Sequence, residues 1–134
     1  MSPDLTQKLL DKYPKLFSNQ HFWGFECGDG WYDILDHLCG AISEYTYLDV
    51  MSKSPYDANE IYVDQIKEKF GRLRFYLSRE DDVMHGMVSM AEYMSAHICE
   101  TCGERGELRA GSWLVTLCDK HNNERIGKIP HGHT

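Results

Sequence analysis

The 134-residue sequence predicts an α+β fold with three helices, a small antiparallel sheet and a compact C-terminal module. Apolar residues recur at steps of three and four over residues 29–47 and 80–98, which is the pattern of helices with one buried face. Residues 61–77 instead alternate apolar and polar side chains, as half-buried strands do. Cysteine and histidine pairs at 99–102 and 118–121 indicate a metal-binding module at the C-terminal end.

The first helix is expected to begin at Ser2 and Pro3, because a hydroxyl cap precedes a residue whose φ angle is already helical. It is expected to end before Pro14. Residues 18–30 form a loop that is rich in aromatic residues and glycine. Solvated loops rarely carry so many large rings, so we expect this loop, which contains Trp23, either to pack over the core or to line a pocket.

The second helix is expected to run from residue 29 or 30 to about residue 47, and a polar linker follows over residues 49–60. Two paired strands then cover residues 61–77, with a reversal near Gly71. The third helix spans about residues 80–98 and carries a stripe of methionines. The stripe either packs against the sheet, which its helical spacing favours, or forms an adaptable binding surface.

The composition predicts one domain with a small appended module. Hydrophobic residues make up 42% of the chain and aromatic residues 12%, which is enough for one substantial core. We expect residues 1–98 to form a helical and hairpin core, residues 99–125 to form a zinc module packed on it, and residues 126–134 to form a mobile tail.

The zinc expectation comes from the spacing of Cys-Glu-Thr-Cys-Gly at 99–103 and Cys-Asp-Lys-His at 118–121. Zn²⁺ takes four nitrogen or sulfur ligands in a tetrahedron, and a Cys-x-x-Cys turn supplies two thiolates on one knuckle. A redox Cys-x-x-Cys would need a thioredoxin-like βαβ context, which this sequence does not predict. We predict a structural Zn²⁺ without an open coordination position, bound by Cys99, Cys102, Cys118 and His121.

Between the two ligand pairs, residues 106–109 and 113–117 are typical of a β-hairpin, and a short helix to about Arg125 follows. Knuckle, hairpin and helix start in this order predict a treble-clef-like zinc module. A treble clef can carry an HNH-type nuclease centre whose general base is a histidine of the hairpin. Neither strand of this hairpin contains histidine, which argues against that activity.

Charge and targeting signals narrow the class of protein. The formal charge of −7 argues against a general nucleic-acid-binding protein, which would present a basic face. The N-terminal residues lack the pattern of a signal peptide, and no apolar run reaches the ~20 residues that span a membrane. With three cysteines assigned to zinc, Cys27 and Cys39 remain as free thiols, which favours a reducing compartment. We therefore expect a cytoplasmic protein without membrane contact.

One basic cluster stands out in this acidic chain. Its members are Lys67, Lys69, Arg72, Arg74 and Arg79, with Tyr62 and Tyr76 among them. Arginines two residues apart on a strand point to the same side and suit a phosphate or carboxylate, and neighbouring rings can stack on a base. We predict a nucleotide-sized site formed by Arg72, Arg74, Tyr76, Trp23, Asp29 and Trp31. The alternative is a solvated strand face whose arginines pair with nearby acidic residues.

Catalytic motifs are scarce, and we predict no catalytic residue. The chain has no phosphate-binding loop of the Walker type and no Gly-x-Ser-x-Gly elbow. A hydrolytic site would have to draw on His21, Asp29, Asp33, His37 and Glu44, whose spacing is not diagnostic.

Three stretches of the sequence are distinctive. They are Gly28-Asp-Gly-Trp31, then Asp64-Gln-Ile-Lys-Glu-Lys-Phe-Gly-Arg-Leu-Arg-Phe-Tyr76, then Cys99-x-x-Cys102 with Leu117-Cys-Asp-Lys-His121. Together they resemble a family of small proteins encoded by tailed phages and prophages. The resemblance covers about residues 12–125, and Lys-Phe-Gly-x-Leu-Arg-Phe-Tyr is its most specific part. It implies an accessory phage protein in the host cytoplasm, where such proteins often counter host defences, and it implies no catalytic residue.

The leading hypothesis is a non-enzymatic phage-type protein that binds and sequesters a nucleotide-like immune signal. A homo-oligomer with its site at a subunit boundary fits such a role. Two alternatives stay open: a protein-interaction module that inhibits a host defence complex through its acidic surface or methionine stripe, and a metal-dependent hydrolase acting on a nucleotide or nucleic acid.

Overall fold

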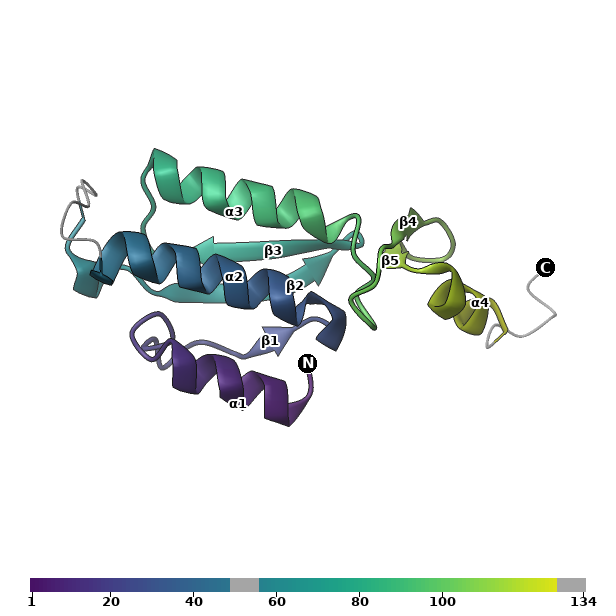
Figure 1. Ribbon diagram of the computed structural model, residues 1–134, viewed down its shortest axis with the longest axis horizontal. Helices are drawn as coiled ribbons and strands as arrows, with labels where there is room; N and C mark the ends of the chain where they lie inside the picture. Colours follow the sequence, from purple (N-terminus) through teal and green to yellow (C-terminus); the bar gives the residue numbers. More distant parts are fainter. Residues whose placement is uncertain (49–55, 128–134) are drawn as a thin grey trace.

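The computed structural model describes residues 1–48 and 56–127 (Figure 1). The α-helices of this part of the chain are α1 (Pro3–Lys12), α2 (Tyr32–Ser43), α3 (Asp82–Ser95) and α4 (Asp119–Gly127). Its strands are β1 (Phe25–Glu26), β2 (Val63–Lys69), β3 (Arg72–Leu77), β4 (Glu107–Arg109) and β5 (Val115–Leu117). Helical turns of other types cover Asp29–Trp31, Glu44–Leu48 and Ala58–Glu60.

The fold is α+β, as predicted, and it differs from the expectation in two respects. The described residues form four α-helices rather than three, because the short helix expected around His121, to about Arg125, extends over nine residues as α4. The main sheet is mixed rather than antiparallel: its order is β1-β2-β3, and β1 runs parallel to β2. β1 has only two residues, which is too short for an alternating pattern to reveal it.

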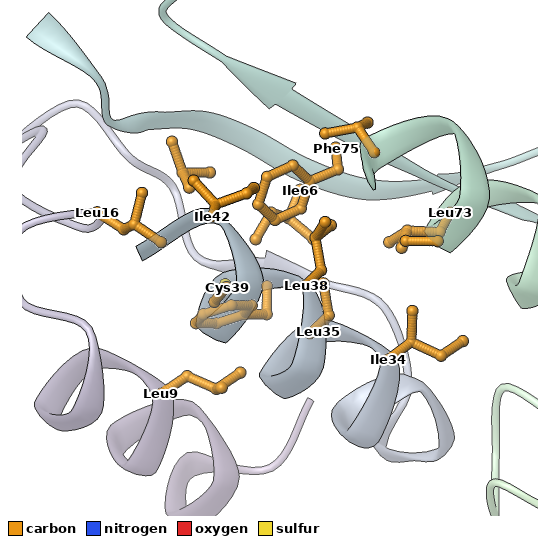
Figure 2. Packing of buried hydrophobic residues seen from close by; sticks show 14 of the residues in the cluster. Leu9, Leu16, Ile34, Leu35, Leu38, Cys39, Ile42, Ile66, Leu73 and Phe75 are labelled. Atoms are coloured by element: carbon orange, nitrogen blue, oxygen red, sulfur yellow. The ribbon is translucent and has the colours of Figure 1, made fainter. Parts of the chain in front are cut away.

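The core lies between the main sheet and two helices. α2 and α3 cover one face of the sheet (Figure 1), and the strand residues Val63, Ile66, Leu73 and Phe75 on that face are at most 2% exposed. Figure 2 shows Ile66, Leu73 and Phe75 together with apolar residues of α2. Burial of large apolar side chains is the main stabilising contribution to such a fold.

The outer edge of the sheet, at β3, is closed by side chains of α3. The N–H group of Leu73 donates to Oγ of Ser95 (2.9 Å), and the N–H group of Phe75 donates to Oε2 of Glu92 (3.0 Å). Occupied edge groups are no longer available to an added strand, so these contacts end the sheet at β3.

The aromatic loop before β1 packs on the core in part. The rings of Phe17, Phe22 and Phe25 contact one another, with centroids 5.2 to 5.3 Å apart. Trp23, in contrast, is 85% exposed. The loop therefore combines a packed aromatic cluster with one solvent-exposed ring.

The metal-ligand module joins the core beside the start of α2. Trp31 is fully buried, and its indole N–H donates to the carbonyl oxygen of Ile98 (2.9 Å). The N–H group of Gly30 donates to the carbonyl oxygen of Glu100 (2.8 Å). A Cβ atom at Gly30 would overlap the carbonyl oxygen of Cys99, so glycine permits this close approach of two backbones.

Two expected segments lie partly outside the described residues. Of the predicted linker, residues 49–55 fall outside, and residues 58–60 form a helical turn. Of the predicted tail, residues 128–134 fall outside, and residues 126–127 complete α4.

Candidate metal centre and basic sheet face

Cys99, Cys102, Cys118 and His121 lie together, with ligand atoms that are all within 4.8 Å of one another. The Sγ atoms of Cys102 and Cys118 are 3.8 Å apart, and Nδ1 of His121 is 3.7 Å from Sγ of Cys99 and 3.2 Å from Sγ of Cys118. A tetrahedral ion with sulfur ligands at ~2.3 Å places those ligands about 3.8 Å apart. The four atoms therefore form a cluster of the size that one metal ion requires.

A turn, a strand end and a helix start position these ligands. The knuckle closes through Gly103, whose φ of +85° favours glycine and whose N–H donates to the carbonyl oxygen of Cys99 (2.9 Å). Cys118 follows β5 directly, and His121 lies in the first turn of α4. The N–H group of His121 points at Sγ of Cys118 (3.5 Å).

The Cys99 thiol has an environment that favours its ionised form. Burial by itself raises the pKa of this thiol, but hydrogen bonds from the backbone of Cys118, Cys102 and Thr101 outweigh burial and lower the pKa to about 7. Because the thiolate is the metal-binding form of cysteine, these backbone groups prepare the site for a cation.

Glu124 faces the other side of the His121 ring. Nε2 of His121 lies 3.9 Å from Oε2 of Glu124, while Nδ1 points toward the sulfur atoms. A carboxylate near the second ring nitrogen is the usual way in which proteins orient a metal-binding histidine. At 3.9 Å the contact is longer than a hydrogen bond, so Glu124 lies near this nitrogen without holding the ring by a hydrogen bond.

Within residues 1–48 and 56–127, no second group of three or more His, Cys, Asp or Glu side chains is close enough to share an ion. The residues considered for a hydrolytic site, His21, Asp29, Asp33, His37 and Glu44, thus form no such group there. Nδ1 of His37 lies 2.6 Å from the backbone carbonyl oxygen of Asp33 rather than near its carboxylate.

The main sheet has a second face, opposite α2 and α3, that is open to solvent. Its side chains come from the cross-strand pairs Gln65–Tyr76, Lys67–Arg74 and Lys69–Arg72. None of these six residues is buried, whereas Val63, Ile66, Leu73 and Phe75 on the other face are at most 2% exposed. We call the set Lys67, Lys69, Arg72, Arg74 and Tyr76 the basic face.

The cations of the basic face have no acidic partner within the described part of the chain. No ion pair within 4.0 Å involves any of the four there, although Glu26 lies beside Lys67 in register. Arg79, the fifth member of the predicted cluster, behaves differently, because it pairs with Glu60 (3.8 Å). The alternative in which the arginines pair with nearby acidic residues therefore holds for Arg79. It does not hold for the four cations of the basic face within the described residues.

The structure does not bring all six predicted ligand-binding residues together. Trp23 is exposed just before β1, on the opposite side of β2 from β3. Oδ1 of Asp29 accepts a hydrogen bond from the N–H group of Ser2 (2.6 Å), and Trp31 is buried. Asp29 and Trp31 therefore belong to the junction at the start of α2, while Arg72, Arg74 and Tyr76 share the basic face.

Sequence reasoning missed Phe70, which lies in the β2–β3 turn at the end of the basic face. Its side chain is 67% exposed, and its φ angle is +54°. The signal was present in the sequence, since a large aromatic residue precedes Gly71 where tight hairpins usually have Asn or Asp.

A second surface feature is an apolar groove of about 480 Å³ between α2 and α3. Met84, nearer the start of α3, is fully buried, whereas Met90 and Met94, which line the groove, are 60% and 44% exposed. The methionine stripe of α3 is thus divided between core packing and an accessible surface.

Comparisons of the chain with protein-family models, with curated proteins and with solved structures gave no match. No helix in the described ranges, 1–48 and 56–127, has the length and apolar character needed to cross a membrane. Functional conclusions therefore rest on the geometry of the chain itself.

Proposed function

We propose that the basic face binds a phosphate-bearing, nucleotide-like ligand without turning it over. The observation that carries this proposal is a group of four cations on one open sheet face, with no ion pair in the described residues, in a chain whose formal charge is −7. Guanidinium groups of Arg72 and Arg74 offer paired donors to phosphate oxygens, and the exposed ring of Tyr76 offers a stacking surface for a base.

Electrostatic repulsion within the basic face supports the same conclusion. Lys67 lies directly opposite Arg74, and Lys69 lies directly opposite Arg72, so that like charges face each other across the two strands. Like charges in directly opposed positions are destabilising by roughly 0.2–1 kcal/mol per pair. A bound phosphate group relieves this repulsion, and the relief adds to the free energy of binding.

The resemblance to small phage and prophage proteins supplies the biological setting of the proposal. In that setting the ligand is a nucleotide immune signal, which the protein sequesters in the host cytoplasm and so withholds from the defence system. Sequestration requires binding without turnover, which is consistent with a site made of cations and a ring.

The metal centre is proposed to hold a structural Zn²⁺ in a treble-clef-like module. Three thiolates and one imidazole are ligands that suit zinc, and they fill its tetrahedral coordination without leaving a position for substrate. Elemental analysis of the purified protein is expected to find one zinc ion per chain. A different metal in stoichiometric amount, or none after purification without chelators, would contradict this assignment.

The ligand proposal is tested first by native mass spectrometry of protein purified from cells, which detects a retained small molecule as mass beyond the metal. Calorimetry with ligand-free protein and a panel of mono-, di- and cyclic nucleotides follows. Arg74→Ala is expected to weaken binding about tenfold or more, because it removes charge-assisted hydrogen bonds. Arg79→Ala, which removes the same charge from a residue already paired with Glu60, is expected to leave the affinity unchanged.

Two outcomes would count against the proposed ligand class. If the two arginine variants weaken binding equally, the effect is one of net charge and not of the basic face. If ligand-free wild-type protein binds no nucleotide of the panel, the proposal is wrong.

The α2–α3 groove supports a second candidate function, a protein-interaction module that inhibits a host defence complex. Exposed methionines form adaptable apolar surfaces, and Met90 and Met94 lie along this groove. Under this alternative, Met94→Glu abolishes copurification of a host protein and Arg74→Ala preserves it. The reverse pattern would exclude the groove as the docking surface.

A further inference from the structure

The β2–β3 turn holds a large exposed ring in an unfavourable backbone conformation. Phe70 has a φ of +54° and Gly71 a φ of +82°, so both central residues of the turn lie in the left-handed region. Two-residue hairpin turns of this kind strongly prefer Asn-Gly, and a bulky residue at positive φ is a genuine outlier. Such outliers are concentrated at binding sites, where the surrounding structure holds them in place.

Contacts with the metal module and with β2 fix this turn. The hydroxyl group of Thr116, a fully buried residue beside the metal ligands, donates to the carbonyl oxygen of Gly71 (2.6 Å). On the other side, the N–H group of Gly71 donates to Oε2 of Glu68 (2.6 Å). The turn backbone is therefore anchored at both polar groups of Gly71, while the ring of Phe70 stays 67% exposed.

The basic face and Phe70 together form a linear series of rings and cations. Along β3 the order is Tyr76, then the pair Arg74–Lys67, then the pair Arg72–Lys69, then Phe70 at the turn. Successive rows on one face of a strand are two residues apart, or ~7 Å. The cation pairs therefore form two steps of equal spacing, with an exposed aromatic ring beyond each end.

We infer that the basic face, extended by Phe70, binds a linear single-stranded oligonucleotide of about three nucleotides. This inference rests on the proposed function and specifies its ligand. Consecutive bridging phosphates occupy the two cation rows, and the terminal bases stack on Tyr76 and Phe70, as bases do on aromatic platforms of single-strand-binding proteins. A mononucleotide has one phosphate and one base, so it leaves one cation row and one ring without a partner.

The net charge of the chain limits the length of the ligand. Beyond the two cation rows, a longer strand meets a protein whose formal charge is −7. Each added phosphate outside the basic face is therefore repelled rather than bound. Affinity is expected to rise with length up to the trinucleotide and then to level off, unlike that of a general single-strand-binding protein.

The test is calorimetry of the full-length, metal-loaded protein with AMP, ApA, ApApA and hexa-adenylate. We expect ApApA to bind about tenfold or more tightly than AMP, since it adds a stacked base and a phosphate contact, and hexa-adenylate to bind no more tightly than ApApA. The affinity for ApApA should fall with salt concentration with a log–log slope of about −1.4, which corresponds to two phosphates on a single strand.

Substitutions of Phe70 distinguish the contribution of the aromatic ring to ligand binding from the contribution of the turn conformation to stability. Phe70→Gly and Phe70→Asn suit a positive φ, so neither is expected to lower thermal stability. Both are expected to weaken ApApA binding about tenfold but AMP binding by no more than about twofold, because AMP needs one ring and can still use Tyr76, whereas ApApA uses both rings. Phe70→Tyr keeps a ring and is expected to retain ApApA binding.

The possible results distinguish this inference from the proposed function. If AMP binds as tightly as ApApA, and Arg74→Ala weakens both while Phe70→Gly weakens neither, the basic face binds a nucleotide and the oligonucleotide inference is wrong. Continued gain in affinity from ApApA to hexa-adenylate would also overturn it. If none of these four ligands binds to wild-type protein but a cyclic or other nucleotide of the earlier panel does, this inference is wrong and the proposed function stands; if neither set binds, both fail.

Discussion

The two faces of the β1-β2-β3 sheet are made of alternate residues of the same strands, yet their physical roles differ. On the covered face, Ile66 and Phe75 are buried under α2 and α3, with at most 2% of their surface exposed (Figure 2). On the open face, Lys67 and Arg74 are the corresponding pair; they carry like charges, and neither forms an ion pair within the described residues, although Glu26 lies beside Lys67 in register. The covered face thus stabilises the fold. On the open face, repulsion between like charges opposes folding, and we propose that an anionic ligand reduces this repulsion.

The candidate metal centre offers the largest test of how far the two faces are independent, because Thr116, two residues before Cys118, donates a hydrogen bond to the turn that joins β2 and β3. Removing the metal with a chelator, or replacing Cys102 by Ser, is expected to unfold residues 99–127, since metal-binding free energy, ~10 kcal/mol in isolated zinc-finger peptides, is folding free energy. Hydrogen exchange should show lost protection in that segment and continued protection in α2 and α3. Cys27→Ser, outside the centre, is the control and should keep the metal content.

If the melting temperature and metal content of Cys102→Ser both match those of the wild type, the four-ligand assignment is wrong. If α2 and α3 lose protection as well, the covered face depends on the metal module, and the two regions form one cooperative unit.

The second test compares the faces directly at neighbouring positions of β3. Phe75→Ala is expected to lower the free energy of unfolding by about 3–5 kcal/mol, because it removes a buried ring from the core. Arg74→Ala is expected to change stability by less than about 0.5 kcal/mol, or to raise it slightly by relieving repulsion from Lys67. Urea unfolding measures both, and similar losses for the two variants would show that the open face is not free.

A smaller effect is expected at the closed edge of β3. Ser95→Ala leaves the buried N–H group of Leu73 without its acceptor, which costs about 1–3 kcal/mol. Ser89→Ala, an exposed position on the same helix, is the matched control and should be nearly neutral. Equal stabilities of the two variants in urea unfolding would mean that the Ser95 hydroxyl does not secure the edge.

The smallest effect concerns the outer layer of the covered side, where α1 is tied to α2 through Asp36. Its carboxylate accepts hydrogen bonds from Tyr13 Oη (2.6 Å) and Lys12 Nζ (3.0 Å). Burial tends to raise the pKa of Asp36, but these two donors outweigh it and hold the pKa below the ordinary value of 3.8. Because the folded-state pKa is lowered, the stabilisation is present above pH 3.8 and disappears as the pH falls through the folded-state value.

Asp36→Asn is therefore expected to lower stability by about 1–2 kcal/mol at neutral pH. The difference between variant and wild type should shrink as the pH falls below 3.8 and should vanish once the pH is below the lowered folded-state pKa, where the folded wild type also loses the charged carboxylate. Thermal unfolding across this pH range measures it. A difference that stays constant with pH would show that the charge of Asp36 contributes nothing to the α1–α2 contact.

Features that depend on residues close together in the sequence could be predicted from it. The helical repeat of residues 29–47 predicted α2 and the helical turns on either side of it, and alternation predicted β2 and β3 with Leu73 and Phe75 on one face. The ligand set of the metal centre followed from the spacing of two short pairs, because each pair brings its own turn or helix start. Zinc and the nucleotide-like ligand stay predictions until they are measured.

The sequence by itself thus predicted α1, α2, α3, β2 and β3, the buried side of β3 and the clustering of Cys99, Cys102, Cys118 and His121, since local periodicity and spacing encode them. The tertiary structure alone decided the parallel pairing of β1, the burial of Trp31 against Ile98, the exposure of Met90 and the lack of an ion pair at the four cations of the basic face within the described residues. These properties depend on which distant segments meet. Arg74 and Arg79 look alike in the sequence, and only the position of Glu60 distinguishes an arginine that forms an ion pair from one that forms none within the described residues.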